Sequence, residues 1–105
     1  MLAIPVSEIS REKVAPVFDG CTRVLIFRDA DGEIKQSSEI FLLYASPFDY
    51  LRVLHEEGVT TLICAALSPE AMSYGESLGM RIIQGVPGDV QKALKIYRSW
   101  WASQK

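Results

Sequence analysis

The stretch Val59-Thr60-Thr61-Leu62-Ile63-Cys64-Ala65-Ala66-Leu67, followed at once by Ser68-Pro69-Glu70, decides the fold of this chain. A continuous run of apolar and β-branched residues is typical of a strand that is covered on both faces. The next three residues predict a helix start, because serine caps, proline suits the first helical position and an acid favours the positive helix end. A buried strand that leads directly into a helix indicates an α/β fold with parallel strands.

The same helix-start signal occurs once before this stretch, and two further elements follow it. Ser46-Pro47-Phe48-Asp49 predicts a helix that ends near Gly58. After the helix that begins at Ser68 and ends at Gly79, residues Arg81–Gln84 predict a short strand. The last helix follows Asp89, with apolar residues at helical spacing at Val90, Ala93, Leu94, Tyr97 and Trp101.

The first half of the chain predicts three strands, Leu2–Val6, Arg23–Arg28 and Glu33–Leu43, with a hairpin turn at Asp29–Gly32. We expect them to form an antiparallel meander. The complete order is then β-β-β-α-β-α-β-α, and we expect one α/β domain over residues 1–105. The compact way to pack these elements is a three-layer fold, in which a five-stranded mixed sheet carries helices on both faces.

Composition excludes some partners and locations. The 105 residues include 11 basic and 13 acidic ones, a net charge of −2, and the basic residues are scattered. We therefore expect no nucleic-acid partner. No run approaches the ~18 apolar residues of a membrane span, so we expect no membrane association. The N-terminus lacks the pattern of a signal peptide, which favours a cytoplasmic protein with two reduced cysteines.

A ligand site is expected at the sheet edge where the first and fourth strands end, because the chain order reverses there. Several connections should meet at this edge: the loop from Ser7, the entry to the second strand at Phe18–Cys21, and the helix starts at Ser46, Ser68 and Asp89. Helix N-termini offer N–H groups and partial positive charge. This arrangement would favour an anionic ligand.

Enzymatic chemistry is not predicted. A two-metal nuclease needs several carboxylates, one of them on the first strand, and Leu2–Val6 contains none. The one histidine, His55, falls near the end of the first helix, away from the expected site. No Ser-His-Asp or Cys-His arrangement can be built on this plan.

The two cysteines leave two interpretations open. Cys64 in the buried strand is a core residue by default, but its place near the carboxyl end of that strand keeps a thiolate ligand role open. Cys21 follows the Phe18-Asp19-Gly20 turn. For this residue a structural role and a role in the site are equally open. Trp100 and Trp101 point ~100° apart on a helix, so one of them suggests a surface contact, such as that of a homodimer.

Short motifs along almost the whole chain resemble the dinitrogenase iron-molybdenum cofactor biosynthesis family. In the first half they are Ile4-Pro5-Val6, Val14-Ala15-Pro16-Val17-Phe18-Asp19 and Val24-Leu25-Ile26-Phe27. In the second half they are Gly58-Val59, Leu62-Ile63-Cys64-Ala65-Ala66, Leu78-Gly79-Met80-Arg81-Ile82-Ile83 and Gly88-Asp89-Val90. Their order and spacing together carry the resemblance.

The resemblance implies a ribonuclease H-like fold and a non-enzymatic carrier of an iron–sulfur or iron–molybdenum cofactor precursor, with metallocluster assembly proteins as partners. Better-known carriers of this kind place a histidine just before the second-strand turn, where this chain has Val17. The predicted binding residues are Phe18, Asp19, Gly20, Cys21, Cys64 and Ser68, with Cys21 and Cys64 as metal ligands. The alternative is a divergent protein-interaction or regulatory module of the same fold with no bound cluster.

Overall fold

The computed structural model describes residues 1–7, 10, 12–16, 18, 23–30, 33–41 and 46–103. For residues 29, 30, 33 and 100–103 it describes the backbone alone. The predicted surface role of a tryptophan at 100 or 101 therefore lies outside the described side chains.

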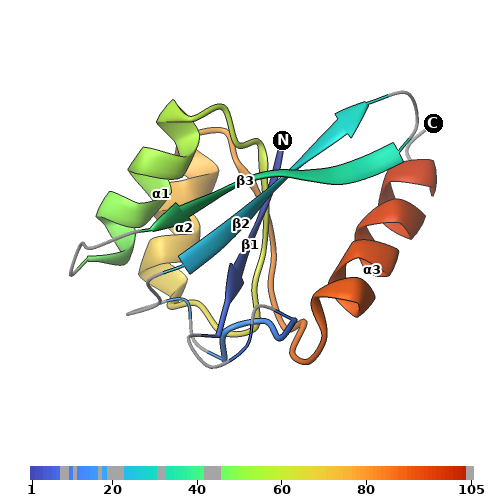
Figure 1. Cartoon of the computed structure of the whole chain (residues 1–105). Helices are drawn as coiled ribbons and strands as arrows, with labels where there is room; N and C mark the ends of the chain where they lie inside the picture. Colours follow the sequence, from blue (N-terminus) through green and yellow to red (C-terminus); the bar gives the residue numbers. More distant parts are fainter. Residues whose placement is uncertain are drawn as a thin grey trace.

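A single mixed sheet with strand order β3-β2-β1-β4-β5 forms the centre of the structure (Figure 1). Its strands are β1 (Leu2–Val6), β2 (Arg23–Ala30), β3 (Glu33–Phe41), β4 (Thr61–Ile63) and β5 (Arg81–Ile83). The first three strands pair antiparallel, whereas β1–β4 and β4–β5 pair parallel. This is the α/β, ribonuclease H-like arrangement predicted from the sequence, and the chain order reverses between β1 and β4 as expected.

Helices cover both faces of the sheet. The helices α1 (Pro47–Glu56) and α2 (Pro69–Ser77) lie on one face, and α3 (Val90–Ser103) lies on the other (Figure 1). Two buried clusters follow from this layering. The α1–α2 core contains Phe18, Tyr50, Leu62 and Cys64, and the α3 core contains Leu25, Phe27, Ile63, Val90 and Leu94.

A β-bulge in the edge strand β3 changes which face its side chains meet. Ile26 pairs with Ser38, but the next residue, Phe27, pairs with Gln36, so Ser37 is the extra residue. The bulge lets Ile40 pack against the α1–α2 core while Ile34 packs against the α3 core. Without it, the two isoleucines would face the same side, because alternate strand residues share a face.

The strand boundaries differ from the sequence prediction at three places, the smallest being the fifth strand, which was predicted over Arg81–Gln84 and ends at Ile83. Asp29 and Ala30 were assigned to a turn, but they pair with Ile34 and Glu33 and extend β2. The fourth strand was predicted over Val59–Leu67, whereas its ladder covers only Thr61–Ile63 because the partner β5 is equally short. The predicted turn residues 31 and 32 and the end of the third strand at 42 and 43 lie outside the described residues.

Helices α1 and α2 begin as predicted. The hydroxyl oxygen of Ser46 accepts a hydrogen bond from the Phe48 N–H, and that of Ser68 accepts one from the Ala71 N–H. Helix α2 presents small residues to the core, and its Met72 is only half-buried. Its buried residues are Ala71 and Gly75, because this helix lies so close to β5 that only small residues fit. Leu78 packs against the α1–α2 core only in part.

Within the described residues, no helix has both the length and the apolar character that crossing a membrane requires.

Candidate functional site at the carboxyl end of the sheet

Residues 12–16 and 18 cross the edge where β1, β4 and β5 end, here termed the carboxyl-end rim. The Ala15 N–H donates to the Pro5 carbonyl oxygen at 2.9 Å, and the Phe18 N–H donates to the Ala66 carbonyl oxygen at 2.9 Å. This segment therefore joins the end of β1 to the chain just beyond β4. Of the predicted Phe18-Asp19-Gly20 turn, the structure describes Phe18 alone, and this residue lies near the end of the fourth strand.

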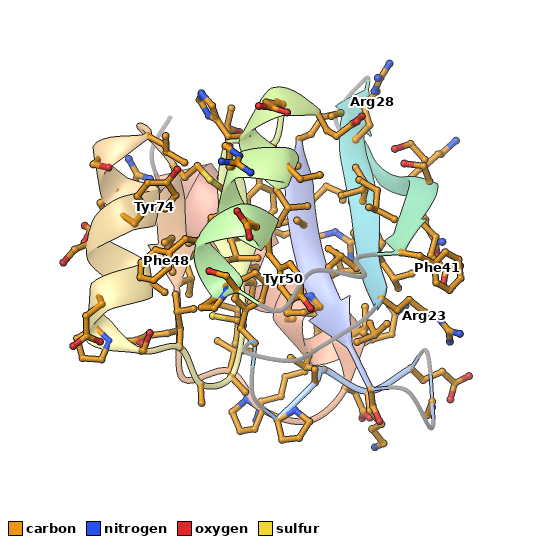
Figure 2. All side chains as sticks on the ribbon, turned by 90° about the vertical axis from the view of Figure 1, so that its left-hand side faces the viewer. Arg23, Arg28, Phe41, Phe48, Tyr50 and Tyr74 are labelled. Atoms are coloured by element: carbon orange, nitrogen blue, oxygen red, sulfur yellow. The ribbon has the colours of Figure 1, made fainter. Side chains whose placement is uncertain are left out.

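Phe18 lies inside the molecule rather than at a binding surface. Its side chain is fully buried, and its ring meets the Tyr50 ring edge to face, with 5.7 Å between centroids and 82° between planes. Tyr50 belongs to α1 (Figure 2), so the contact between the two rings packs Phe18 against the first helix. Phe18 is thus a core residue.

Cys64 is also a core residue in this structure. It has no exposed surface and packs in the α1–α2 core, while its backbone N–H donates to the Ile83 carbonyl oxygen at 2.9 Å. Burial raises the pKa of its thiol to about 12, because a thiolate would lose its hydration. The thiol is therefore protonated at neutral pH, and metal ligation would require the site to open.

Ser68 and the helix starts provide fewer N–H donors than the sequence suggested. Pro47 and Pro69, the first residues of α1 and α2, have no N–H. The two cap serines use one further N–H of each helix. In α3, the Val90 N–H donates to the Glu12 carbonyl oxygen at 2.8 Å.

Acidic side chains also accompany all three helix starts. Asp49 and Glu70 lie in the first turns of α1 and α2, and Asp89 directly precedes α3. These carboxylates partly neutralise the partial positive charge that the helix dipoles place at the amino ends of the helices. The described part of the rim is therefore less favourable to an anion than the helix directions alone predict.

An ion pair between Lys13 and Asp89 fastens the crossing segment to the start of α3. The two residues also form an antiparallel bridge, and the Val14 N–H donates to the Gly88 carbonyl oxygen at 2.7 Å. The hydrogen bond and charge of Lys13 lower the pKa of Asp89, and Asp89 raises the pKa of Lys13. Both side chains are more than half exposed, so the pair orients the segment more than it stabilises the fold.

Three of the predicted binding residues, Asp19, Gly20 and Cys21, lie outside the described residues. Within the part of the chain that is described, no three His, Cys, Asp or Glu side chains gather closely enough to hold a metal ion. His55 lies exposed in the last turn of α1, at the opposite end from the cap Ser46, as the sequence predicted.

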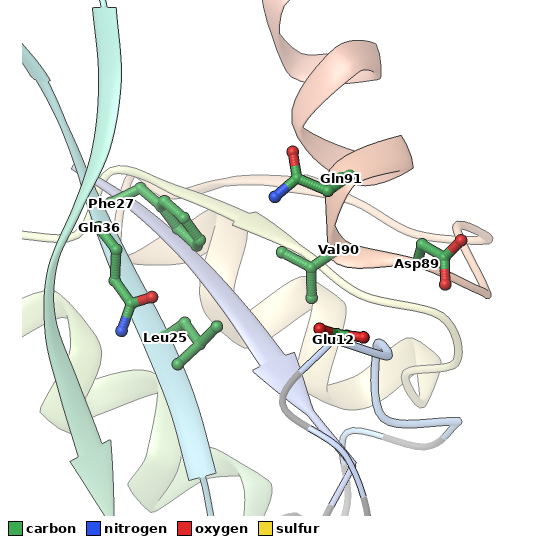
Figure 3. A pocket seen from close by; sticks show the side chains of 7 residues that line it. All are labelled: Glu12, Leu25, Phe27, Gln36, Asp89, Val90 and Gln91. Atoms are coloured by element: carbon green, nitrogen blue, oxygen red, sulfur yellow. The ribbon is translucent and has the colours of Figure 1, made fainter.

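A cavity that the sequence reasoning missed lies on the other face, between the β2–β3 ribbon and the start of α3 (Figure 3). Its volume is about 490 Å³, and it is lined by Glu12, Leu25, Phe27, Gln36, Asp89, Val90 and Gln91. No short motif marks it, because its residues come from four separate segments. The bulge that aligns Gln36 with Phe27 also has no evident signal in the sequence.

Residues 1–99 match the family described as dinitrogenase iron-molybdenum cofactor. The chain belongs to this family. Membership in the dinitrogenase iron-molybdenum cofactor family links the chain to metallocluster assembly related to that cofactor. No protein of curated function matches it significantly in sequence.

Solved structures share the fold of this family member. The protein PH0822 superposes with a TM-score of 0.83 at 17% identity, covering 93% of this chain and 88% of that one. The mj0327 protein of Methanocaldococcus jannaschii gives a TM-score of 0.73 at 23% identity, covering 93% and 86%. The apo form of the orange protein from Desulfovibrio gigas gives 0.73 at 15% identity, covering 91% and 84%. At these identities the likeness shows the fold alone.

Proposed function

We propose that this protein is a non-enzymatic carrier of an iron–sulfur or iron–molybdenum cofactor precursor, which it binds at the carboxyl-end rim and passes to metallocluster assembly proteins. The observation that carries the proposal is the family match over residues 1–99. The cluster is cargo, so its ligands need not form a closed metal site in the empty protein. The hydrogen bond from Phe18 to Ala66 supports this location, because it holds Phe18, which directly precedes Asp19 in the sequence, near the end of β4.

The proposal assigns different roles to the predicted residues. Phe18 is a positioning residue, because its buried ring holds the entry to the 19–22 segment against Tyr50. Cys21, three residues further along the chain, is the thiolate ligand, with Asp19 and Gly20 shaping the turn. Ser68 caps α2 at the same rim. Cys64 becomes a second ligand only where cluster binding exposes its thiol, since the buried thiol is protonated.

The test is cluster uptake under anaerobic conditions. The purified chain is incubated with ferrous iron and sulfide, with and without tetrathiomolybdate, and then desalted. Retained iron, sulfide and molybdenum are measured together with visible absorption. We expect stoichiometric uptake by the wild type, near-complete loss in Cys21→Ser, and partial or no loss in Cys64→Ala.

His55→Ala serves as the control, because His55 is an exposed potential ligand far from the rim and should not affect uptake. A colourless wild-type protein that retains no metal under any of these conditions would contradict the carrier proposal. Uptake that is unchanged in both cysteine variants would contradict the assigned ligands while leaving the carrier role standing.

The second candidate is an interaction or regulatory module of the same fold that binds no cluster. Two observations favour it: the thiol of Cys64 is buried, and acidic residues accompany the starts of all three helices. Light scattering and pull-down with the metal-free chain test it. A monomer that captures no specific partner, or a partner that binds only the metal-loaded chain, would exclude this candidate.

A further inference from the structure

The cavity between the β2–β3 ribbon and α3 has the composition of a small-molecule site. Its volume of about 490 Å³ falls in the range of ligand pockets, roughly 300–1,000 Å³. Leu25 and Phe27 of β2 supply an apolar floor, and each is about 95% covered, with exposed fractions of 4% and 5%. Four of the seven lining residues, Glu12, Gln36, Asp89 and Gln91, are polar and exposed, so polar groups surround this small apolar floor.

The β-bulge at Ser37 directs a polar side chain to this cavity. Because of the bulge, Gln36 lies directly opposite Phe27 and so shares its face of the sheet. In a regular ladder Phe27 would instead face Ser37, and Gln36 would lie on the α1–α2 side. Bulges that redirect a side chain are frequent beside functional sites. Gln91, in the first turn of α3, lines the cavity from the opposite wall (Figure 3).

The charge at the lower end of the cavity is negative. The Glu12 carbonyl oxygen accepts the Val90 N–H, and this bond holds Glu12 against the start of α3. Asp89 lies on the far side of Val90 from Leu25 and Phe27, and it pairs with Lys13 (Figure 3). The amino end of a helix by itself favours an anion. Here its first N–H is already bonded, and the two carboxylates that line the cavity are Glu12 and Asp89, of which Asp89 is paired with Lys13.

We infer that this cavity binds a small organic molecule with an aromatic or other flat apolar body and an ammonium or amide N–H group. The body lies against Leu25 and Phe27, Glu12 accepts the N–H or ammonium donor, and the two glutamine amides donate to or accept from polar groups on the ligand. Such a ligand differs in charge from an anionic cluster. The site also lies on the opposite face of the sheet from the α1–α2 core that contains Cys64.

Two indole probes of opposite charge test the inference. Tryptamine and 3-indolepropionate share the same ring but carry an ammonium and a carboxylate. Each is titrated into ¹⁵N-labelled wild-type protein while backbone and glutamine side-chain amide signals are followed. We expect saturable shifts at Phe27, Gln36 and Gln91 with tryptamine, and at least about twofold weaker binding of 3-indolepropionate, the size of an exposed charge interaction.

Two variants and a matched control complete the experiment. Glu12→Gln should weaken tryptamine binding about two- to fivefold, while Glu76→Gln, an equal charge change on the exposed face of α2, should not. Gln91→Trp should fill the cavity and abolish the shifts at Gln36 with the helix intact by circular dichroism. Absence of saturable shifts at Gln36 and Gln91, equal affinity of the two probes, or equal affinity of Glu12→Gln and wild type would overturn the inference.

Discussion

The backbone N–H of Phe18 donates a hydrogen bond to the carbonyl oxygen of Ala66, 2.9 Å away, although the two residues lie far apart in the sequence. Ala66 lies three residues after the end of β4, and Phe18 precedes β2, so the bond ties the chain ahead of the antiparallel strand β2 to the parallel half of the sheet. The buried ring of Phe18 against Tyr50 reinforces the same junction. The first prediction concerns this junction.

Phe18→Ala should destabilise the protein by about 3–5 kcal/mol, because it removes a fully buried ring and leaves a cavity beside Tyr50. Urea denaturation followed by circular dichroism measures the change. Phe48→Ala is the matched control, since Phe48 also meets a tyrosine edge to face but is 40% exposed. Its loss should be clearly smaller, and equal losses in the two variants would contradict the assigned role of Phe18.

The Cys64 thiol should react slowly in the folded protein. In the single-thiol variant Cys21→Ser, the raised pKa of about 12 leaves roughly one thiol in 10⁴ ionised at pH 8. Modification by a disulfide reagent should therefore be at least about 100-fold slower than in guanidinium, and its rate should rise with pH. Rapid, stoichiometric labelling of the folded variant would show that Cys64 is accessible after all.

The same pKa shift predicts how stability depends on pH. The folded pKa of Cys64 lies above its ordinary value of 9.0, so burial of the neutral thiol contributes fully below pH 9 and is lost progressively as the pH rises toward 12. The loss approaches ~1.4 kcal/mol per pH unit in that window. Cys64→Ala should lack this slope when urea midpoints are compared between pH 8 and 11. Parallel pH profiles of the two proteins would contradict the shift.

A side chain at Gly75 of α2 should destabilise the protein while Ile82 is present. A Cβ at Gly75 would lie 2.5 Å from the Cδ1 atom of Ile82. We expect Gly75→Ala to destabilise by about 1 kcal/mol, since overpacking of about 1–3 kcal/mol exceeds the helix-propensity gain of about 1 kcal/mol. Ile82→Val removes the clashing atom, so in that background Gly75→Ala should become neutral or stabilising. The same cost in both backgrounds would exclude this contact as the cause.

Ser68 should contribute to stability as a helix cap, independently of any ligand. Ser68→Ala removes the acceptor for the Ala71 N–H and should cost about 1 kcal/mol in thermal or urea unfolding. Ser73→Ala, at an exposed position in the middle of the same helix, is the control and should change stability little. If cluster uptake is preserved in Ser68→Ala, Ser68 acts as a cap alone.

Local chemistry in the sequence predicted the frame of the molecule well. The Ser-Pro motifs at the starts of α1 and α2 predict helix caps from about four residues of sequence. Both serines accept the capping hydrogen bonds in the structure. The reversal of chain order between the first and fourth strands was also predicted, and it is present in the sheet. The predicted length of β4 was wrong. A strand ends where its neighbours stop pairing, and β5 pairs with only three residues of β4.

The candidate site was less predictable. Its location at the carboxyl-end rim followed from topology, but the state of Cys64 did not, because burial and the resulting pKa depend on how helices pack over the sheet. The cavity beneath α3 depends on the bulge at Ser37 and on the contact between Glu12 and Val90. Both arise from long-range pairing, which no local pattern encodes.

The sequence by itself determined the order of strands and helices, the helix caps and the family, because propensity, capping and hydrophobic period act over a few neighbouring residues. The tertiary structure alone decided that Phe18 and Cys64 are buried, that Gly75 must remain small, and that Gln36 faces α3. These properties depend on which distant segments come into contact, and packing density and local dielectric arise only once they have met.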